Sequence, residues 1–152
     1  LFFNFLSLKI FNLPTFEIKR KKMETRDTGL LSIRGGSLGE QKSEASLEEL
    51  FQNNTLRPIL KFQNDVLIAV FKNYIQQQKS PFYDLGVAKK IAFIDNALQK
   101  DSTLKNTLKG IVIGLFTQQE LAEYTSNASV LNKRMIGLIT ERLKSQLQLL
   151  EK

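Results

Sequence analysis

The sequence contains no cysteine, no histidine and no tryptophan, and these absences exclude large classes of function. Without cysteine, the chain can form no disulfide, no thiolate nucleophile and no zinc finger. Without histidine, it can build no Ser-His or Cys-His dyad, no imidazole proton relay and no His-ligated metal centre. The lack of tryptophan and histidine also leaves few side chains that could stack on nucleic-acid bases.

The residues that are present suffice for one domain with a single core, because the 152-residue chain is 42% apolar. The net charge of +7 is distributed unevenly. Residues 1–22 carry five basic side chains and one acidic side chain, whereas residues 23–152 carry 17 basic and 14 acidic side chains, a net charge of +3. The part after residue 22 therefore gives no strong electrostatic argument for an anionic partner.

The first methionine is Met23, and it follows a run of four basic residues at 19–22. Residues 1–22 are dominated by Phe, Leu, Asn, Lys and Ile, which A/T-rich codons encode. We interpret residues 1–22 as upstream sequence translated in frame, outside the native structure. A secretory signal would place its positive charges before the apolar stretch, and a membrane anchor would need about 20 mostly apolar residues. An interfacial amphipathic helix is the alternative for this segment.

Residues 23–45 contain several glycines and few large apolar side chains, which predicts a flexible arm. Gly35, Gly36 and Gly39 do not form a phosphate-binding loop, because Glu40 follows Gly39 and no strand precedes them. Order is expected to begin at Ser46, which forms a predicted capping box with Glu49. The ordered part, residues 46–152, is predicted to be a single helical domain.

Hydrophobic periodicity predicts about four main helices and two short ones, and no segment alternates with the period of a strand. A short helix at 47–53 is expected to break at 53–55, where Thr55 can cap the next helix at 57–78. Asp84 is expected to cap a third helix, and Asp101 or Ser102 a fourth. A capping box from Thr117 to Glu120 opens a fifth helix, and the last helix spans 127–150. The predicted fold is an all-α, compact bundle with a flexible N-terminal arm.

Two glycines in the fourth predicted helix, Gly110 and Gly114, are four positions apart and so lie on one face. We interpret this pair as the place where another helix approaches closely. The apolar run beside it covers only residues 111–116, which is too short to cross a membrane. We expect no transmembrane segment anywhere in the chain and a cytoplasmic location.

The candidate partner surface combines loop aromatics, charged residues near helix ends and one exposed leucine, at positions where ligand and partner sites tend to lie. Its members are Phe82, Tyr83, Asp84, Lys109, Lys133, Arg134 and Leu149. The alternative for Phe82 and Tyr83 is that they close one end of the bundle. Leu149 lies outside the apolar stripe of the last helix, which makes a homodimer a further expectation.

Carboxylates and basic residues offer the two other candidate chemistries. Glu120 and Glu123 share a helix face, but Glu120 has a predicted capping role and Glu123 a predicted exposed position. Asp65 has Lys61 one turn before it, whereas Asp95 has no basic residue one turn away, and both are interpreted as exposed helix positions. We expect no catalytic residue, no metal and no cofactor. A basic face could track phosphates; its candidate residues are Lys89, Lys90, Lys100, Lys105, Lys109, Lys133, Arg134, Arg142 and Lys144.

Four short stretches between residues 50 and 150 resemble a family of small, uncharacterised all-helical bacterial proteins that sometimes carry the label "glyoxalase". They are Leu56-Arg57-Pro58 with Gln63-Asn64, the corner at 82–85, the stretch at 109–117 and the run at 131–135. The resemblance implies a helical fold and a start near Met23, and it carries over no catalytic residue.

The sequence therefore favours a non-enzymatic helical interaction or regulatory module that binds a protein partner. A glyoxalase-type enzyme is an alternative that the family label suggests and that the lack of His and Cys disfavours. Weak nucleic-acid binding through the basic face is the other alternative.

Overall fold

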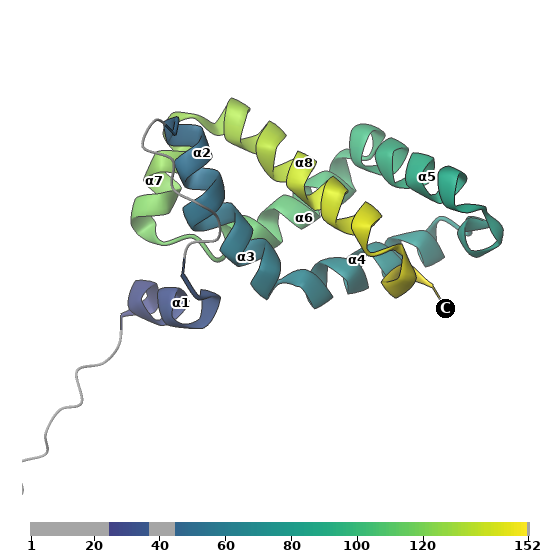
Figure 1. The fold of residues 1–152 in the computed structure, drawn as a ribbon, viewed down its shortest axis with the longest axis horizontal. Helices are drawn as coiled ribbons and strands as arrows, with labels where there is room; N and C mark the ends of the chain where they lie inside the picture. The colour runs from purple at the N-terminus through teal and green to yellow at the C-terminus, as the bar shows by residue number, and fades with distance from the viewer. Residues whose placement is uncertain (1–24, 37–44, 152) are drawn as a thin grey trace, which may run out of the picture.

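A computed structural model describes residues 25–36 and 45–151, and every regular element in these two ranges is helical (Figure 1). The predicted all-α fold is thereby confirmed. In chain order the elements are α1 (Arg26–Arg34), α2 (Leu47–Phe51), the π-helical turn η1 (Gln52–Leu56), α3 (Arg57–Phe62), α4 (Asn64–Gln77), the 3-10 turn η2 (Phe82–Asp84), α5 (Val87–Lys100), α6 (Ser102–Ile113), α7 (Gln118–Ser126), α8 (Ala128–Ser145) and the 3-10 turn η3 (Leu147–Leu150).

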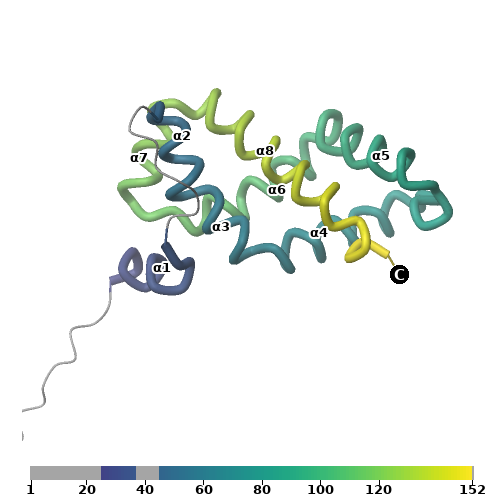
Figure 2. The backbone as a smooth tube through the Cα atoms, viewed as in Figure 1, coloured from purple at the N-terminus to yellow at the C-terminus, as the bar shows by residue number. Residues whose placement is uncertain are grey.

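The longest helix, α8, runs diagonally along the molecule and contacts α5, α6, α7 and η1 (Figure 2). Helices α2 and α7 lie at one end of the molecule, and α5 lies at the other. The central position of α8 follows from its apolar stripe, in which Leu131, Met135, Ile139 and Leu143 are all buried.

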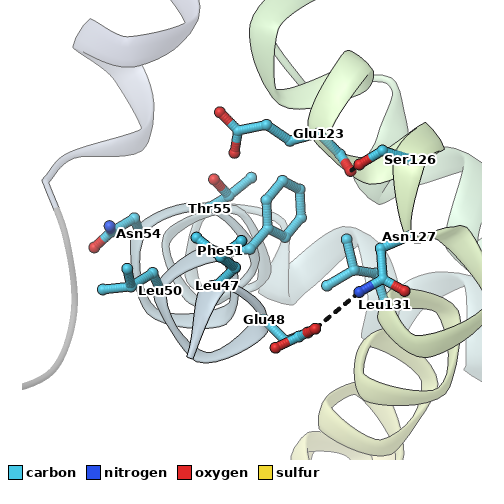
Figure 3. A pocket seen from close by; sticks show the side chains of 10 residues that line it. All are labelled: Leu47, Glu48, Leu50, Phe51, Asn54, Thr55, Glu123, Ser126, Asn127 and Leu131. Carbon is cyan, nitrogen blue, oxygen red and sulfur yellow. Dashed lines mark hydrogen bonds between the residues drawn. The ribbon is translucent and has the colours of Figure 1, made fainter. Parts of the chain in front are cut away.

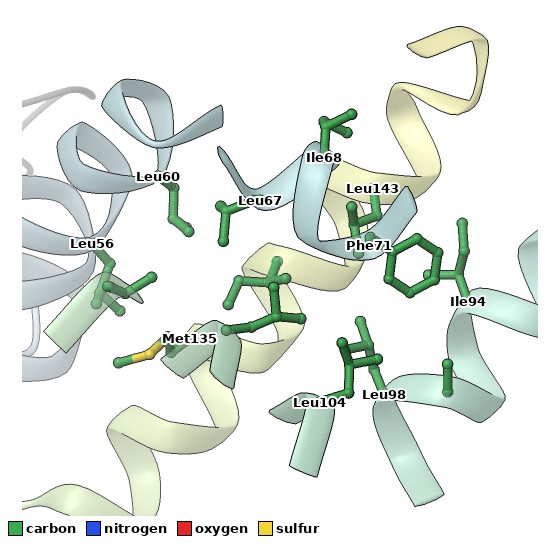
Figure 4. Packing of buried hydrophobic residues seen from close by; sticks show 14 of the residues in the cluster. Leu56, Leu60, Leu67, Ile68, Phe71, Ile94, Leu98, Leu104, Met135 and Leu143 are labelled. Carbon is green, nitrogen blue, oxygen red and sulfur yellow. The ribbon is translucent and has the colours of Figure 1, made fainter. Parts of the chain in front are cut away.

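One continuous core joins these helices (Figure 4). Its largest fully buried side chains include Phe71 from α4 and Met135 from α8, and Figure 4 shows them on neighbouring helices around a shared interior. Burying a side chain of this size contributes about 1.5–3 kcal/mol. The core is therefore the main source of stability, and it positions the surface elements that carry the polar groups.

Three helix starts have caps at the predicted residues, although at Ser46 only the hydroxyl half of the predicted capping box with Glu49 is present. The Ser46 hydroxyl accepts from the Glu49 amide at 3.2 Å, and the Asp101 carboxylate accepts from the Leu104 amide at 2.9 Å. At α7, Thr117 and Glu120 form a complete capping box.

The predicted cap of the third helix, Asp84, was wrong. Gly86 precedes α5 without a side-chain hydrogen bond, while Asp84 belongs to the 3-10 turn η2. Leu85 and Gly86 lie between Asp84 and the first residue of α5, which places the Asp84 side chain outside capping range.

The predicted break at 53–55 is absent, because the chain passes from α2 into α3 through the π-helical turn η1. The Arg57 amide bonds to the Gln52 carbonyl, five positions back. The extra residue in this turn brings Phe51 and Leu56 to the same buried side. Thr55 lies inside the turn and is buried, so it caps no helix.

The predicted single helix at 57–78 is interrupted at Gln63, which has φ −89° and ψ 8°. No glycine or proline marks this position. Instead, α3 contacts α1 and η1, whereas α4 contacts α6 and η3, and the two sets of neighbours require different helix directions. Tertiary packing therefore places the bend.

The close helix approach predicted at Gly110 and Gly114 is also wrong. A Cβ atom on Gly110 would meet no heavy atom within 4 Å. A Cβ atom on Gly114 would meet only carbonyl oxygens of its own helix, the nearest being Gly110 O at 3.1 Å. Gly114 instead ends α6.

The prediction of a flexible arm over 23–45 was wrong for residues 26–34, which form α1. The Thr25 hydroxyl accepts from the Thr28 amide, and Gly35 ends the helix with φ 76°, a conformation that glycine adopts at little cost. The interpretation of 1–22 as upstream sequence falls on residues outside the described ranges, as do positions 23, 24 and 37–44 of the arm. Within the described ranges, no helix has the length and apolar character that crossing a bilayer requires.

Candidate functional site

The residues of the predicted partner surface differ in burial, from fully buried to exposed. Phe82 is fully buried and packs edge-on against Phe93, with ring centroids 5.3 Å apart. The half-buried Tyr83 ring lies 5.8 Å from the Phe82 ring. The alternative interpretation therefore holds for Phe82, which closes the core and cannot contact a partner.

The remaining predicted residues are distributed over η2, α6, α8 and η3. Lys133 is exposed on α8, and Leu149, 44% exposed, lies in η3 beyond the end of that helix. From Lys133 to Ser145, the last residue of α8, the helix spans about 18 Å, and Leu149 lies beyond that end. Arg134 donates to the Gln52 amide oxygen at 3.0 Å. Of the others, Asp84 is exposed in η2 and Lys109 is half-buried on α6.

Two lysines of the predicted basic face form ion pairs within the chain. Lys90 is buried and pairs with Glu151 at 2.6 Å, and its ammonium also lies 5.6 Å from the centre of the Phe82 ring. Lys144 pairs with Asp95 at 2.5 Å, so the interpretation of Asp95 as a simple exposed position missed a partner on another helix. Lys90 and Lys144 therefore each form an ion pair with a carboxylate of the same chain.

The most buried ion pair among the described residues joins α1 to α7. Arg34 Nη1 and Nη2 donate to the two carboxylate oxygens of Glu120, each at 2.8 Å. The side chains are 1% and 13% exposed. Arg34 Nη1 also donates to the Leu115 carbonyl at 2.8 Å. A bidentate pair with this burial holds the two helices in one orientation.

Two more donors complete the environment of Glu120. The Thr55 hydroxyl donates to Glu120 Oε1 at 2.9 Å, and the Thr117 amide donates to Oε2 at 2.7 Å. Burial by itself raises the pKa of Glu120, but the hydrogen bonds from Arg34, Thr117 and Thr55 outweigh it and hold the pKa below its ordinary value. The carboxylate is thus ionised at neutral pH and occupied on both oxygens, which suits a structural role.

Helix α1 makes a second set of contacts with the corner between α6 and α7. Arg26 donates to the Gly114 and Phe116 carbonyls, both at 2.9 Å. Asp27 accepts from the amide of Gln118, the first residue of α7, at 3.0 Å. Carbonyls at a helix end and an amide at a helix start are the groups that lack partners within their own helices. Helix α1 therefore completes the hydrogen bonding of this corner.

A pocket of about 500 Å³ opens beside this cluster, between α2, α7 and the start of α8 (Figure 3). The residues that line it are Leu47, Glu48, Leu50, Phe51, Asn54, Thr55, Glu123, Ser126, Asn127 and Leu131. Its volume falls in the usual range for ligand pockets of about 300–1,000 Å³.

The pocket combines an apolar interior with acidic edges. Phe51 and Leu131 are buried in its wall, and Leu47 is 82% exposed. In the view of Figure 3, Glu48 and Glu123 lie at opposite ends, and the Asn127 amide donates to the Glu48 carboxylate at 2.9 Å. Hydrogen bonds from its own backbone amide and from Ser46 lower the pKa of Glu48, so it is charged at neutral pH.

The sequence offered only part of this site. The caps at Ser46 and at Thr117 with Glu120 were visible in the sequence. The pairing of Glu120 with Arg34 was not, because these two residues are 86 positions apart. No motif links α2 to α7, so the pocket was missed entirely. In the described ranges, no group of three or more Asp and Glu side chains is arranged to hold a metal ion.

Comparison with known proteins identifies no relative. No family model, no curated protein and no solved structure matches the chain. The resemblance to the glyoxalase-labelled family therefore stays a hypothesis, and the argument for function rests on the residues above.

Proposed function

We propose that the chain is a non-enzymatic helical interaction module that binds a segment of a protein partner in the pocket between α2, α7 and α8. The observation that carries this proposal is the composition of the pocket: an apolar wall that includes Phe51 and Leu131, with Glu48 and Glu123 and with no basic side chain among the lining residues. Apolar grooves with charged edges are typical of surfaces that bind peptides.

The occupant that fits this composition is a short segment with an apolar side chain flanked by lysine or arginine. The apolar side chain would cover the interior and the exposed Leu47, and the basic side chains would reach Glu48 and Glu123. Electrostatic complementarity of this kind favours one charge sign and speeds association. The π-helical turn η1 supports the proposal, since such turns are frequent at functional sites and Asn54 and Thr55 of this turn line the pocket.

The test is a selection from a display library of short random peptides, with the full chain immobilised. Peptides that carry leucine or phenylalanine next to lysine or arginine should be enriched. The affinity of an enriched peptide, measured by fluorescence anisotropy, should fall as salt is added, because the ion pairs are screened. Glu123→Gln should weaken binding by up to about fivefold, the range of an exposed ion pair.

A matched control is Asp65→Asn, which removes an exposed carboxylate from α4, away from the pocket. This variant should bind the peptide as the parent does. Leu47→Ser, at an exposed position, should weaken binding without loss of fold. Enrichment of acidic peptides, no enrichment at all, or equal effects of Glu123→Gln and Asp65→Asn would each overturn the proposal.

A further inference from the structure

A second pocket, of about 440 Å³, lies between α3 and the end of α8 and carries the opposite charge. Arg57 and Arg142 line it together with one carboxylate, that of Glu141. Leu60 and Leu138 supply its apolar part. Two guanidinium groups and one carboxylate give this pocket a net positive charge.

Arg142 differs from Arg34 and Lys90, the two buried cations among the described residues. Arg34 and Lys90 each form an ion pair, with Glu120 and Glu151. In residues 25–36 and 45–151, Arg142 has no carboxylate within ion-pair distance, and its hydrogen-bond partner is the Asn64 side-chain oxygen at 3.0 Å. Partial burial lowers its pKa, yet an arginine stays protonated at neutral pH. Burying a cation without a counterion costs free energy, which a bound anion would offset.

Gln146 also lines the pocket, but its side-chain oxygen Oε1 is buried from solvent, so a ligand in the pocket does not reach it. The accessible acceptor is the carboxylate of Glu141, which is exposed. A carboxylate only accepts hydrogen bonds at neutral pH, so an occupant of this pocket needs a donor as well as a negative charge.

We propose that this pocket binds a small organic anion that carries hydroxyl groups, of the kind found in sugar phosphates. Arg57 and Arg142 hold the anionic group. A ligand hydroxyl donates to the Glu141 carboxylate, and the leucines contact the carbon skeleton. This site is separate from the peptide pocket and does not depend on it, because the two pockets share no lining residue.

The test is a titration of the full chain, labelled with ¹⁵N, with glycerol 3-phosphate as the probe. Inorganic phosphate and glycerol serve as partial probes. Amide shifts in α3 and in the last turns of α8 should saturate with glycerol 3-phosphate, more weakly with phosphate and not with glycerol. Arg57→Gln and Arg142→Gln should each weaken binding at least fivefold, whereas Arg142→Lys should retain part of the affinity because it keeps the charge.

Lys61→Gln is the matched control, since Lys61 is an exposed cation on the same helix as Arg57 but does not line the pocket. This variant should bind as the parent does. Arg57 is exposed, so its variant keeps the test valid even where Arg142→Gln lowers stability. The proposal is overturned if glycerol 3-phosphate produces no saturable shifts, if Lys61→Gln weakens binding as much as Arg57→Gln does, or if phosphate binds as tightly as glycerol 3-phosphate.

Discussion

The Arg34 guanidinium donates a hydrogen bond to each oxygen of the Glu120 carboxylate, both at 2.8 Å, although the two residues are 86 positions apart in the sequence. Both side chains are largely withdrawn from water. The connection between α6 and α7 supplies a further partner to each side chain, the Leu115 carbonyl to Arg34 and the Thr117 amide to Glu120. This pair attaches α1 to the rest of the fold.

Glu120→Gln should lower the free energy of unfolding by about 3 kcal/mol, because it leaves the buried Arg34 cation without its counterion. Urea denaturation at pH 7, followed by circular dichroism, measures this loss. Hydrogen exchange should also show faster exchange of the amides in α1, since α1 loses its strongest contact.

The control for this variant is Glu123→Gln, which removes an exposed carboxylate three positions further along α7. We expect this change to stay within about 0.5 kcal/mol. If the two variants unfold at the same urea concentration, the Arg34 pair does not contribute as described.

The stability should also depend on pH through Glu120. Its pKa is lowered in the folded chain from a reference value of 4.5, so the folded state binds the proton less readily than the unfolded state. The stabilisation is therefore fully present above about pH 4.5 and is lost as the pH falls through the folded pKa.

Urea denaturation of the parent and of Glu120→Gln between pH 7 and pH 3 tests this linkage. The difference in free energy of unfolding between the two proteins should shrink below pH 4.5. Glu48, whose pKa is also lowered, is present in both proteins and contributes equally. A difference that stays constant over the whole range would contradict the assignment to Glu120.

Gly110→Ala should stabilise the protein by about 0.5–1 kcal/mol. Gly110 lies inside α6, where alanine has the higher helix propensity, and the added Cβ would meet nothing within 4 Å. Thermal unfolding measures the gain as a higher midpoint temperature.

Gly114→Ala provides the contrast, because its Cβ would approach the Gly110 carbonyl oxygen to 3.1 Å. Its gain should be smaller than that of Gly110→Ala, or it should destabilise the protein. A large loss of stability in Gly110→Ala would instead support the close helix approach that the sequence predicts.

The features that could be predicted from sequence are those whose causes lie within a few residues. The caps at Ser46, Asp101 and Thr117 depend on a side chain and an amide three positions away, and all three were found. The bend at Gln63 has no such local cause, since no glycine or proline marks it. The buried position of Phe82 was open between two interpretations, because an aromatic residue in a loop can face either way.

The sequence by itself determined that the described chain is helical and where α2, α6 and α7 begin, because periodicity and capping are short-range effects. Only the tertiary structure decided that α1 is a helix docked through Arg34, that Thr55 faces Glu120 from a π-helical turn, and that two pockets of opposite charge exist. These features join residues from distant segments, and their free energy comes from groups that meet only when the core is packed.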